Sequence, residues 1–264
     1  MNNKYLIFAH YHPNGMIRND ILEFLKKSKK IFKEIIFIST KIKKNQIKKI
    51  PKQIKIIKRR NIGYDYYSHK KGWEYLNKKF DRNLYNKNLF FTHSGILFVK
   101  PDKLLNLISK KSIGNKEFWG VTRSLELTDH IQTYFFFFSG NLFENKNIFN
   151  WWKNIKTWNN RNKVEKFELG LSNLMIQNDI KIISCYKKNI KLKTKNVFKK
   201  LNQRIKEIFL KEPKYYKKDP LKYFWRDLYN KYGFIKTKYI EYIKENNPKH
   251  SIKDLYPLLK QKDF

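Results

Sequence analysis

Short apolar runs alternate with amphipathic segments over residues 1–190. Mostly apolar runs are typical of buried strands, and they lie at 5–9, 34–39, 54–57, 89–92, 118–122, 132–138 and 180–185. Apolar residues at helical spacing predict helices over 17–32, 67–76, 143–158 and 167–177, and Pro101 opens another. The alternation predicts an α/β domain with a mostly parallel sheet flanked by helices.

The ends of the predicted strands indicate where a ligand would bind. In open α/β sheets, ligands bind beyond the carboxyl ends of the strands. This rule selects the loops at 10–15, 59–65 and 92–95 and the loop before His130. The candidate site residues are therefore expected in these four loops.

The pattern changes beyond residue 190. An apolar stripe over 197–209 lies on a Lys-rich helix, and prolines and aromatic residues follow between charged ones. We therefore predict a first domain over 1–190 and a small, basic, helical appendage over 191–264 that packs its aromatic side chains on that domain.

The composition narrows the class of protein. With 17% aromatic residues among 264, the chain is too aromatic for a disordered protein, even at a formal charge of +37. A single cysteine can form neither an internal disulfide nor a cysteine-rich metal site, which favours a reducing compartment. The most apolar run, 134–138, is far shorter than the roughly 20 residues of a membrane-spanning helix. We expect a cytoplasmic protein.

The charge has more than one interpretation. Basic proteins attract nucleic acids and anionic membranes. Only eight of the 59 basic residues are arginine, whose planar fork reads phosphates and base edges. Lysine, asparagine, isoleucine, phenylalanine and tyrosine all have AT-rich codons, and the lysines are spread along the chain. A lysine surface from a biased genome explains the charge better than nucleic-acid binding, and peripheral contact with an anionic inner membrane face stays open.

The loop after the third strand carries the densest polar motif. Arg59 and Arg60 stand beside Asn61 and Gly63, and Asp65 follows. Two guanidiniums and a Gly-permitted turn suit a diphosphate, and the carboxylate could accept a hydrogen bond from a ribose or base. The alternative is an ordinary strand-to-helix turn with a capping aspartate.

Two other loops carry histidines. His10 and His12 invite a metal interpretation, but the single cysteine and the scarcity of nearby carboxylates argue against structural zinc. Contact with a nucleotide base suits that loop better. His93, after the fourth strand, could hydrogen-bond phosphate or ligate a soft metal, and the alternative is an ordinary loop histidine.

Two further side chains could act in chemistry. His130 lies at a strand edge after a polar loop, where a structural histidine is the commoner case. Glu168 is placed at the start of a helix, where the helix dipole stabilises a carboxylate. The functional alternative for Glu168 is a general base that takes the proton of an acceptor hydroxyl.

In series, these stretches resemble the rhamnan synthesis protein F family of bacterial glycosyltransferases. The matching stretches are the loop at 10–15, the Asn61, Gly63, Asp65 and Gly72 pattern, Phe118-Trp119-Gly120, the run 130–135, Phe167-Glu168 with Leu171-Ser172, Asp219-Pro220, Phe224-Trp225-Arg226, Gly233-Phe234-Ile235-Lys236 and Asn247-Pro248. They follow one another in the family's order over nearly the whole chain.

The resemblance implies a GT-A-like fold and transfer of a sugar, rhamnose or another deoxysugar, from a nucleoside-diphosphate donor. The implied acceptor is a growing lipid-linked glycan of O-antigen, capsule or rhamnan at the inner membrane face. Implied catalytic residues are Glu168 and, as the alternative base, His130. Implied sugar- or acceptor-binding residues are Trp119, Gln132 and Tyr134. The motifs and the resemblance together give these candidate donor-binding residues: His10, Tyr11, His12, Gly15, Arg59, Arg60, Asn61, Gly63, Asp65, Thr92, His93 and Ser94.

One departure from the family bears on the cofactor. The family usually carries Asn-Asp-Ser where this chain has Thr92, His93 and Ser94. Such a carboxylate helps to hold Mg²⁺ or Mn²⁺ against the diphosphate. The expectations left open are the usual metal, a softer one on His93, or a diphosphate held by Arg59 and Arg60 alone. A degenerate, non-catalytic binding module and a nucleic-acid binder are the alternatives to an enzyme.

Overall fold

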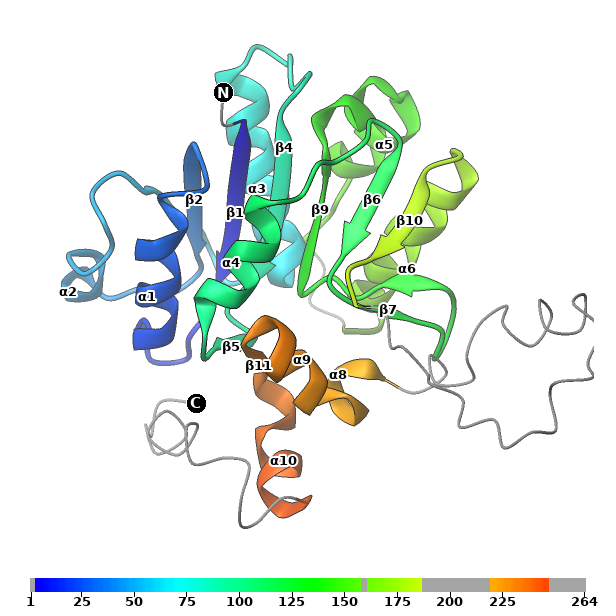
Figure 1. The fold of residues 1–264 in the computed structure, drawn as a ribbon. Coiled ribbons are helices and arrows are strands. Elements are labelled where there is room, and N and C mark those ends of the chain that lie inside the picture. Colours follow the sequence, from blue (N-terminus) through cyan, green and yellow to red (C-terminus); the bar gives the residue numbers. More distant parts are fainter. Residues whose placement is uncertain (1–2, 158–160, 187–218, 247–264) are drawn as a thin grey trace, which may run out of the picture.

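The structure is a computed structural model that describes residues 3–157, 161–186 and 219–246. Its centre is a seven-stranded sheet in the order β10-β6-β9-β4-β1-β2-β3 (Figure 1). The strands are β1 Lys4–His10, β2 Glu34–Ser39, β3 Lys55–Lys58, β4 Asn88–His93, β6 Glu117–Gly120, β9 Phe135–Ser139 and β10 Lys181–Ser184. β9 runs antiparallel to both of its neighbours, and all other pairs are parallel. The predicted mixed, mostly parallel α/β sheet is confirmed.

Helices cover both faces of the sheet (Figure 1). Since side chains alternate along a strand, Leu6 and Phe8 enter one apolar cluster, whereas Tyr5 and Ile7 enter the other. The first cluster packs under α1 (Asn19–Ser28), α4 (Pro101–Ser109) and α9 (Trp225–Tyr232), and the second under α3 (Tyr64–Lys79), α5 (Lys146–Lys153) and α6 (Arg161–Gln177).

Several elements differ from the predicted bounds. The helix predicted from 143 is a 3-10 turn, η1 (Gly140–Glu144), followed by α5, because the Asn145 side chain accepts the N–H groups of Asn147 and Ile148 and starts a new helix. The connection at 41–52 contains a short helix, α2 (Lys44–Ile47). The strand predicted from 132 begins only at Phe135. A small antiparallel pair, β7 (Arg123–Ser124) and β8 (His130–Ile131), precedes it.

The C-terminal segment is less purely helical than predicted. It contains α8 (Pro220–Tyr223), α9, β11 (Phe234–Lys236), the 3-10 turn η4 (Thr237–Tyr239) and α10 (Ile240–Asn246). β11 pairs antiparallel with β5 (Ile96–Phe98), which directly follows β4. Trp225 and Tyr229 pack against Leu97, so the predicted aromatic packing on the first domain is present. The apolar stripe at 197–209 and the boundary at 190 lie outside the described residues.

The membrane prediction can be checked only against the described helices. None of them combines the length and the apolarity that crossing a bilayer requires.

Candidate functional site

A cavity of about 800 Å³ opens at the carboxyl ends of β1 and β4. Its lining comes from the loop after β1, the turn before α3, the end of β4 and residues that follow β11. It gathers these predicted donor-binding residues: His10, Tyr11, His12, Arg59, Asn61, Gly63, Asp65, His93 and Ser94. Three others lie outside the lining: Gly15, Arg60 and Thr92. The cavity therefore unites three of the four predicted loops.

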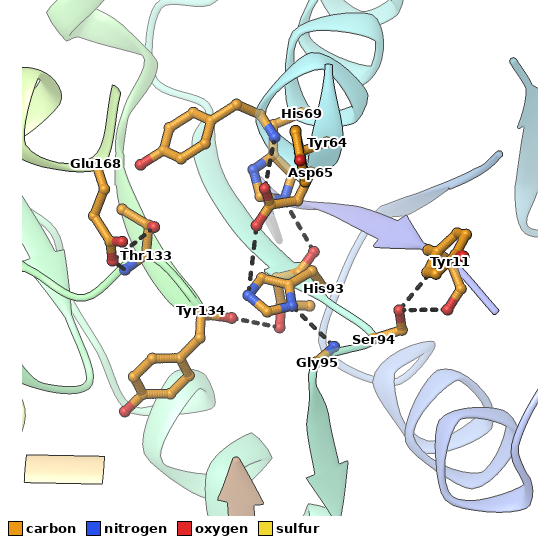
Figure 2. A network of polar contacts seen from close by, with 12 residues as sticks. Tyr11, Tyr64, Asp65, His69, His93, Ser94, Gly95, Thr133, Tyr134 and Glu168 are labelled. Atoms are coloured by element: carbon orange, nitrogen blue, oxygen red, sulfur yellow. Dashed lines mark hydrogen bonds and ion pairs between the residues drawn. The ribbon is translucent and has the colours of Figure 1, made fainter. Parts of the chain in front are cut away.

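Two adjacent residues, His10 and Tyr11, hold the start of the loop after β1 in place. His10 is buried and stacks on Phe37, and its Nδ1 lies 2.9 Å from Ser39 Oγ. Burial, with the nearby His12 and Arg18, lowers the pKa of His10 to about 4, so its ring is neutral at pH 7. The next residue, Tyr11, exchanges two hydrogen bonds with Ser94, each 3.0 Å long (Figure 2).

His12 and Gly15 close the following turn. His12 Nδ1 accepts the N–H of Asn14 at 3.1 Å, and the N–H of Gly15 donates to His12 O at 3.0 Å. Gly15 therefore shapes the loop from outside the cavity. Thr92 also lies outside it, because its buried hydroxyl donates to Tyr134 O at 2.9 Å.

Arg59 holds the turn before α3. Its Nε donates to Ser68 Oγ at 2.9 Å, and its terminal nitrogens donate to the carbonyls of Arg60, Ile62 and Tyr64. Four of the five N–H groups of a guanidinium are thereby used. Burial lowers the pKa of Arg59 to about 10, which leaves it charged at pH 7. Because Arg60 is exposed outside the cavity, the two guanidiniums do not form the clamp predicted for a diphosphate.

This turn depends on unusual backbone angles. Gly63 and Tyr64 are both left-handed, with φ of 72° and 52°. A left-handed tyrosine is strained, and such strain is often found at functional sites. Gly72, about two turns further along α3, has a different role: a Cβ there would lie 2.4 Å from Ile7 Cγ2, so the glycine lets α3 pack closely on β1.

Asp65 and His93 form the cavity floor (Figure 2), and Lys236 contacts His93 from outside the cavity lining. Asp65 Oδ2 lies 3.6 Å from His93 Nε2, and Lys236 Nζ lies 3.1 Å from the same nitrogen. Burial, and then the charge of Lys236, lowers the pKa of His93 to about 3. Burial alone would raise the pKa of Asp65, but His93, His69 and Lys236 outweigh it and lower that pKa. At pH 7 the site therefore holds a carboxylate and a neutral imidazole.

The implied divalent metal can be tested against these donors. Mg²⁺ requires near-octahedral coordination by oxygen ligands. His93 at the end of β4 and Asp65 at the start of α3 offer one ring and one carboxylate, and an amine lies within hydrogen-bond distance of that ring. Within the described ranges, no three His, Cys, Asp or Glu side chains are grouped to hold a metal ion. These residues do not fit Mg²⁺ or Mn²⁺.

Several residues of this site were not identified from the sequence. Arg18 lines the cavity, pairs with Asp20 at 2.9 Å and donates to Ser94 O at 2.8 Å. Thr237 and Lys238 also line it. Lys236 belongs to a stretch that resembles the family, but a C-terminal lysine gives no sequence signal that it reaches the end of β4. That contact depends on the pairing of β11 with β5.

Glu168 lies on the other side of the Asp65–His93 pair from Tyr11 (Figure 2). Its Oε1 accepts the N–H of Thr133 at 2.8 Å and the Thr133 hydroxyl at 3.1 Å. Glu168 lies inside α6 rather than at a helix start, because the helix already begins at Arg161. The predicted dipole stabilisation is therefore wrong, and the hydrogen bonds of Thr133 orient the carboxylate instead.

Glu168 is still close to the cavity floor in electrostatic terms. Burial and then Glu168 raise the pKa of Tyr66, to which Asp65 contributes as well. Burial lowers the pKa of Lys236 to about 8, and the charges of Asp65 and Glu168 oppose that shift. Both carboxylates therefore act on the same small region.

The remaining predicted residues lie outside the cavity lining. His130 Nδ1 is 2.7 Å from Thr128 O. Gln132 donates to Asp219 Oδ1 at 2.9 Å, and Tyr134 is buried with its hydroxyl 3.1 Å from Thr122 Oγ1. Trp119 donates to Glu117 Oε2 at 2.9 Å and stacks on Phe137. The structure thus gathers nine of the twelve predicted donor-binding residues but not the predicted sugar- and acceptor-binding ones.

Comparisons with known proteins give one match over most of the chain. The model of a family described as rhamnan synthesis protein F matches residues 35–249. No curated protein matches the chain.

Two solved structures are similar at low identity. A 4-diphosphocytidyl-2C-methyl-D-erythritol synthase is 9% identical with a TM-score of 0.40, and the match covers 72% of this chain and 91% of that one. The apo form of the glycosyltransferase GlyE from Streptococcus pneumoniae TIGR4 is 10% identical with a TM-score of 0.39, over 70% of this chain and 45% of that one.

Proposed function

Because the chain belongs to the rhamnan synthesis protein F family, we propose that it is a glycosyltransferase that uses a nucleoside-diphosphate sugar. The observation that carries this proposal is the cavity at the carboxyl ends of β1 and β4. It gathers the 10–13 loop, the 59–65 turn and the 93–95 turn around one volume of about 800 Å³. A volume of this size suits a nucleotide-sized ligand.

Two exposed aromatic side chains suit the nucleoside. Tyr11 and Tyr64 line the cavity with 49% and 45% of their surface exposed. Exposed tyrosines beside a cavity favour stacking with a base. Asn61, at the exposed rim, and Asp65, deeper in, are placed to accept or donate hydrogen bonds to base or ribose.

The sugar would be transferred on the Glu168 side of the cavity floor. The acceptor hydroxyl oxygen forms the new bond to the anomeric carbon, and its proton goes to Glu168. The bond from the anomeric carbon to the diphosphate breaks, and its electron pair leaves on the diphosphate oxygen. Thr133 supports this assignment because its two hydrogen bonds hold one oxygen of Glu168 in place. His130 is the alternative base.

The family also suggests which sugar is transferred and which acceptor receives it. We propose a deoxysugar such as rhamnose as the transferred group, and a lipid-linked glycan of a surface polysaccharide as the acceptor. Contact with an anionic membrane surface follows from such an acceptor and from the lysine-rich chain. Sedimentation with anionic and neutral vesicles at low and high salt tests this contact, and failure to bind anionic vesicles at low salt would contradict it.

Donor binding tests the proposed function directly. Thermal shift is measured with UDP, dTDP, GDP and CDP and with their commercially available sugar conjugates. We expect one nucleotide class to stabilise the protein, and its sugar conjugate to be turned over with an acceptor. Stabilisation by none of these, with steeply salt-dependent binding to polynucleotides instead, would contradict a transferase.

A further inference from the structure

The end of β4 carries a contact that a neutral histidine cannot satisfy. His93 Nδ1 accepts the N–H of Gly95 at 2.9 Å. A neutral imidazole has one acceptor nitrogen, so its Nε2 must then carry the proton. Lys236 Nζ lies 3.1 Å from that Nε2. An ammonium group facing an N–H group has no lone pair to donate to, so His93 cannot serve as the acceptor of charged Lys236.

Lys236 has little else to pair with. In the described part of the chain it makes no other hydrogen bond, and its remaining contact is with the ring of Tyr134, 5.6 Å from Nζ to the centroid. Asp65 approaches the same ring nitrogen, at 3.6 Å, and its charge acts on the amine without a hydrogen bond. The lysine is therefore a cation held beside two lining residues of the cavity, His93 and Thr237, without a hydrogen-bond acceptor.

The chain positions this lysine by backbone pairing. Lys236 is opposite Ile96 in the β11–β5 pair, and both the N–H and the hydroxyl of Thr237 bond to Gly95 O, at 3.1 and 3.0 Å. Gly95 lets the His93 ring lie close to this turn, since a Cβ there would lie 2.7 Å from His93 Nδ1, and the amine lies next to the same position. The amine thus lies against the turn that follows β4, where the resemblance implies a metal-binding carboxylate.

We propose that Lys236 is a built-in cation that binds the diphosphate of the donor in place of a divalent metal ion. This inference rests on the proposed function. A phosphate oxygen supplies the acceptor that His93 cannot, and the ammonium counters the negative charge that the diphosphate gains as its bond to the sugar breaks. Lys238, which lines the cavity, adds positive charge near the amine.

Calorimetry of nucleoside diphosphate binding tests this proposal without needing an acceptor. UDP, dTDP, GDP, CDP and inorganic pyrophosphate are titrated into the full chain with EDTA and, separately, with Mn²⁺. We expect the preferred nucleotide to bind within about twofold of the same affinity in both. Lys236→Ala should weaken it about 30-fold, as expected for a lost charge-assisted contact to phosphate. Lys231→Ala, which removes an exposed charge from the same segment, should bind like the parent chain.

The variants separate folding from binding. Lys236→Met keeps the aliphatic stem beside Tyr134 and decides the result if the alanine variant does not fold, while Lys236→Arg should retain most of the affinity. The proposal is overturned if binding requires Mn²⁺, or if Lys236→Met binds like the parent chain, and either result leaves the transferase assignment standing. If the parent chain binds none of the nucleotides with or without Mn²⁺, the proposed function itself fails.

Discussion

Two polar clusters contact the segment 132–134, and they differ in how well their groups are paired. In one, Gln132 connects Thr122 to Asp219, and Asp219 also accepts from Tyr239 and from the N–H of Leu221. In the other, Asp65, His93 and Lys236 meet around a single ring nitrogen that cannot serve both neighbours. Paired groups stabilise a fold, whereas a half-buried cation without an acceptor is poised to bind an anion.

The largest effect is expected for Glu168, the proposed base beside the second cluster. Glu168→Gln keeps an oxygen for Thr133 but cannot take a proton. We expect turnover to fall about 1,000-fold, within the range of general-base catalysis, while nucleotide affinity stays within about twofold. Single-turnover transfer and calorimetry measure the two separately. His130→Ala is the matched control, and a larger loss of turnover there would transfer the role to His130.

Breaking the paired cluster should affect stability and leave binding intact. Gln132→Leu leaves Asp219 Oδ1 and the Thr122 hydroxyl each without one partner, and a buried unpaired polar group costs about 1–3 kcal/mol. We expect a lower Tm by thermal denaturation and unchanged nucleotide affinity for the folded fraction. A loss of affinity at unchanged Tm would place Gln132 in the site instead.

The unpaired cluster should respond to pH. Burial lowers the pKa of Lys236 to about 8, against the opposing charges of Asp65, Glu168 and Asp219 and with the support of Lys238. As pH rises through this value the amine loses its charge, so we expect nucleoside diphosphate affinity to fall about tenfold between about pH 7 and 9.5. In Lys236→Arg, whose guanidinium stays charged, the affinity should remain flat. A parent chain that is equally flat would contradict the assignment.

The smallest effect is expected at the cavity rim. Tyr11→Ala removes an exposed ring that suits base stacking, so we expect about a fivefold loss of affinity for the preferred nucleoside diphosphate and no change for inorganic pyrophosphate. Calorimetry with both ligands separates the contributions. Equal losses for the two would mean that the substitution disturbs the Tyr11–Ser94 hydrogen bonds rather than a base contact.

The sequence identifies what depends on local pattern. The apolar run 34–39 coincides with β2 because each of its residues packs in the sheet, and the strand-end rule brings His10, Asp65 and His93 to one cavity. Features that depend on partners distant in the sequence were not predicted. The run 132–138 ends in five aromatic residues and was predicted as one strand, yet Gln132 to Tyr134 lie outside the sheet and bond with Thr122, Glu168 and Asp219.

Arg59 shows a second limit of prediction from sequence, which is that the role of an arginine can depend on the folded backbone. A pair of arginines after a strand is the same in sequence whether it binds a phosphate or holds its own loop. The carbonyls of Arg60, Ile62 and Tyr64 become acceptors only when the turn adopts its left-handed angles, so the role of Arg59 emerges from the folded backbone. Lys236 is the opposite case. It lies 143 positions from His93 in the sequence, and only the pairing of β11 with β5 brings the two side chains together.

The antiparallel direction of β9 has a consequence for how specificity can diverge. Six strands leave the sheet at the edge that holds the cavity, but β9 enters it there, with Phe135 opposite Thr92. Donor-side residues therefore follow strands, whereas Thr133, which orients Glu168, precedes one. Insertions or substitutions before β9 can reshape what approaches Glu168 while the turns after β1 and β3 keep their register. We expect acceptor preference to be re-engineered independently of donor preference.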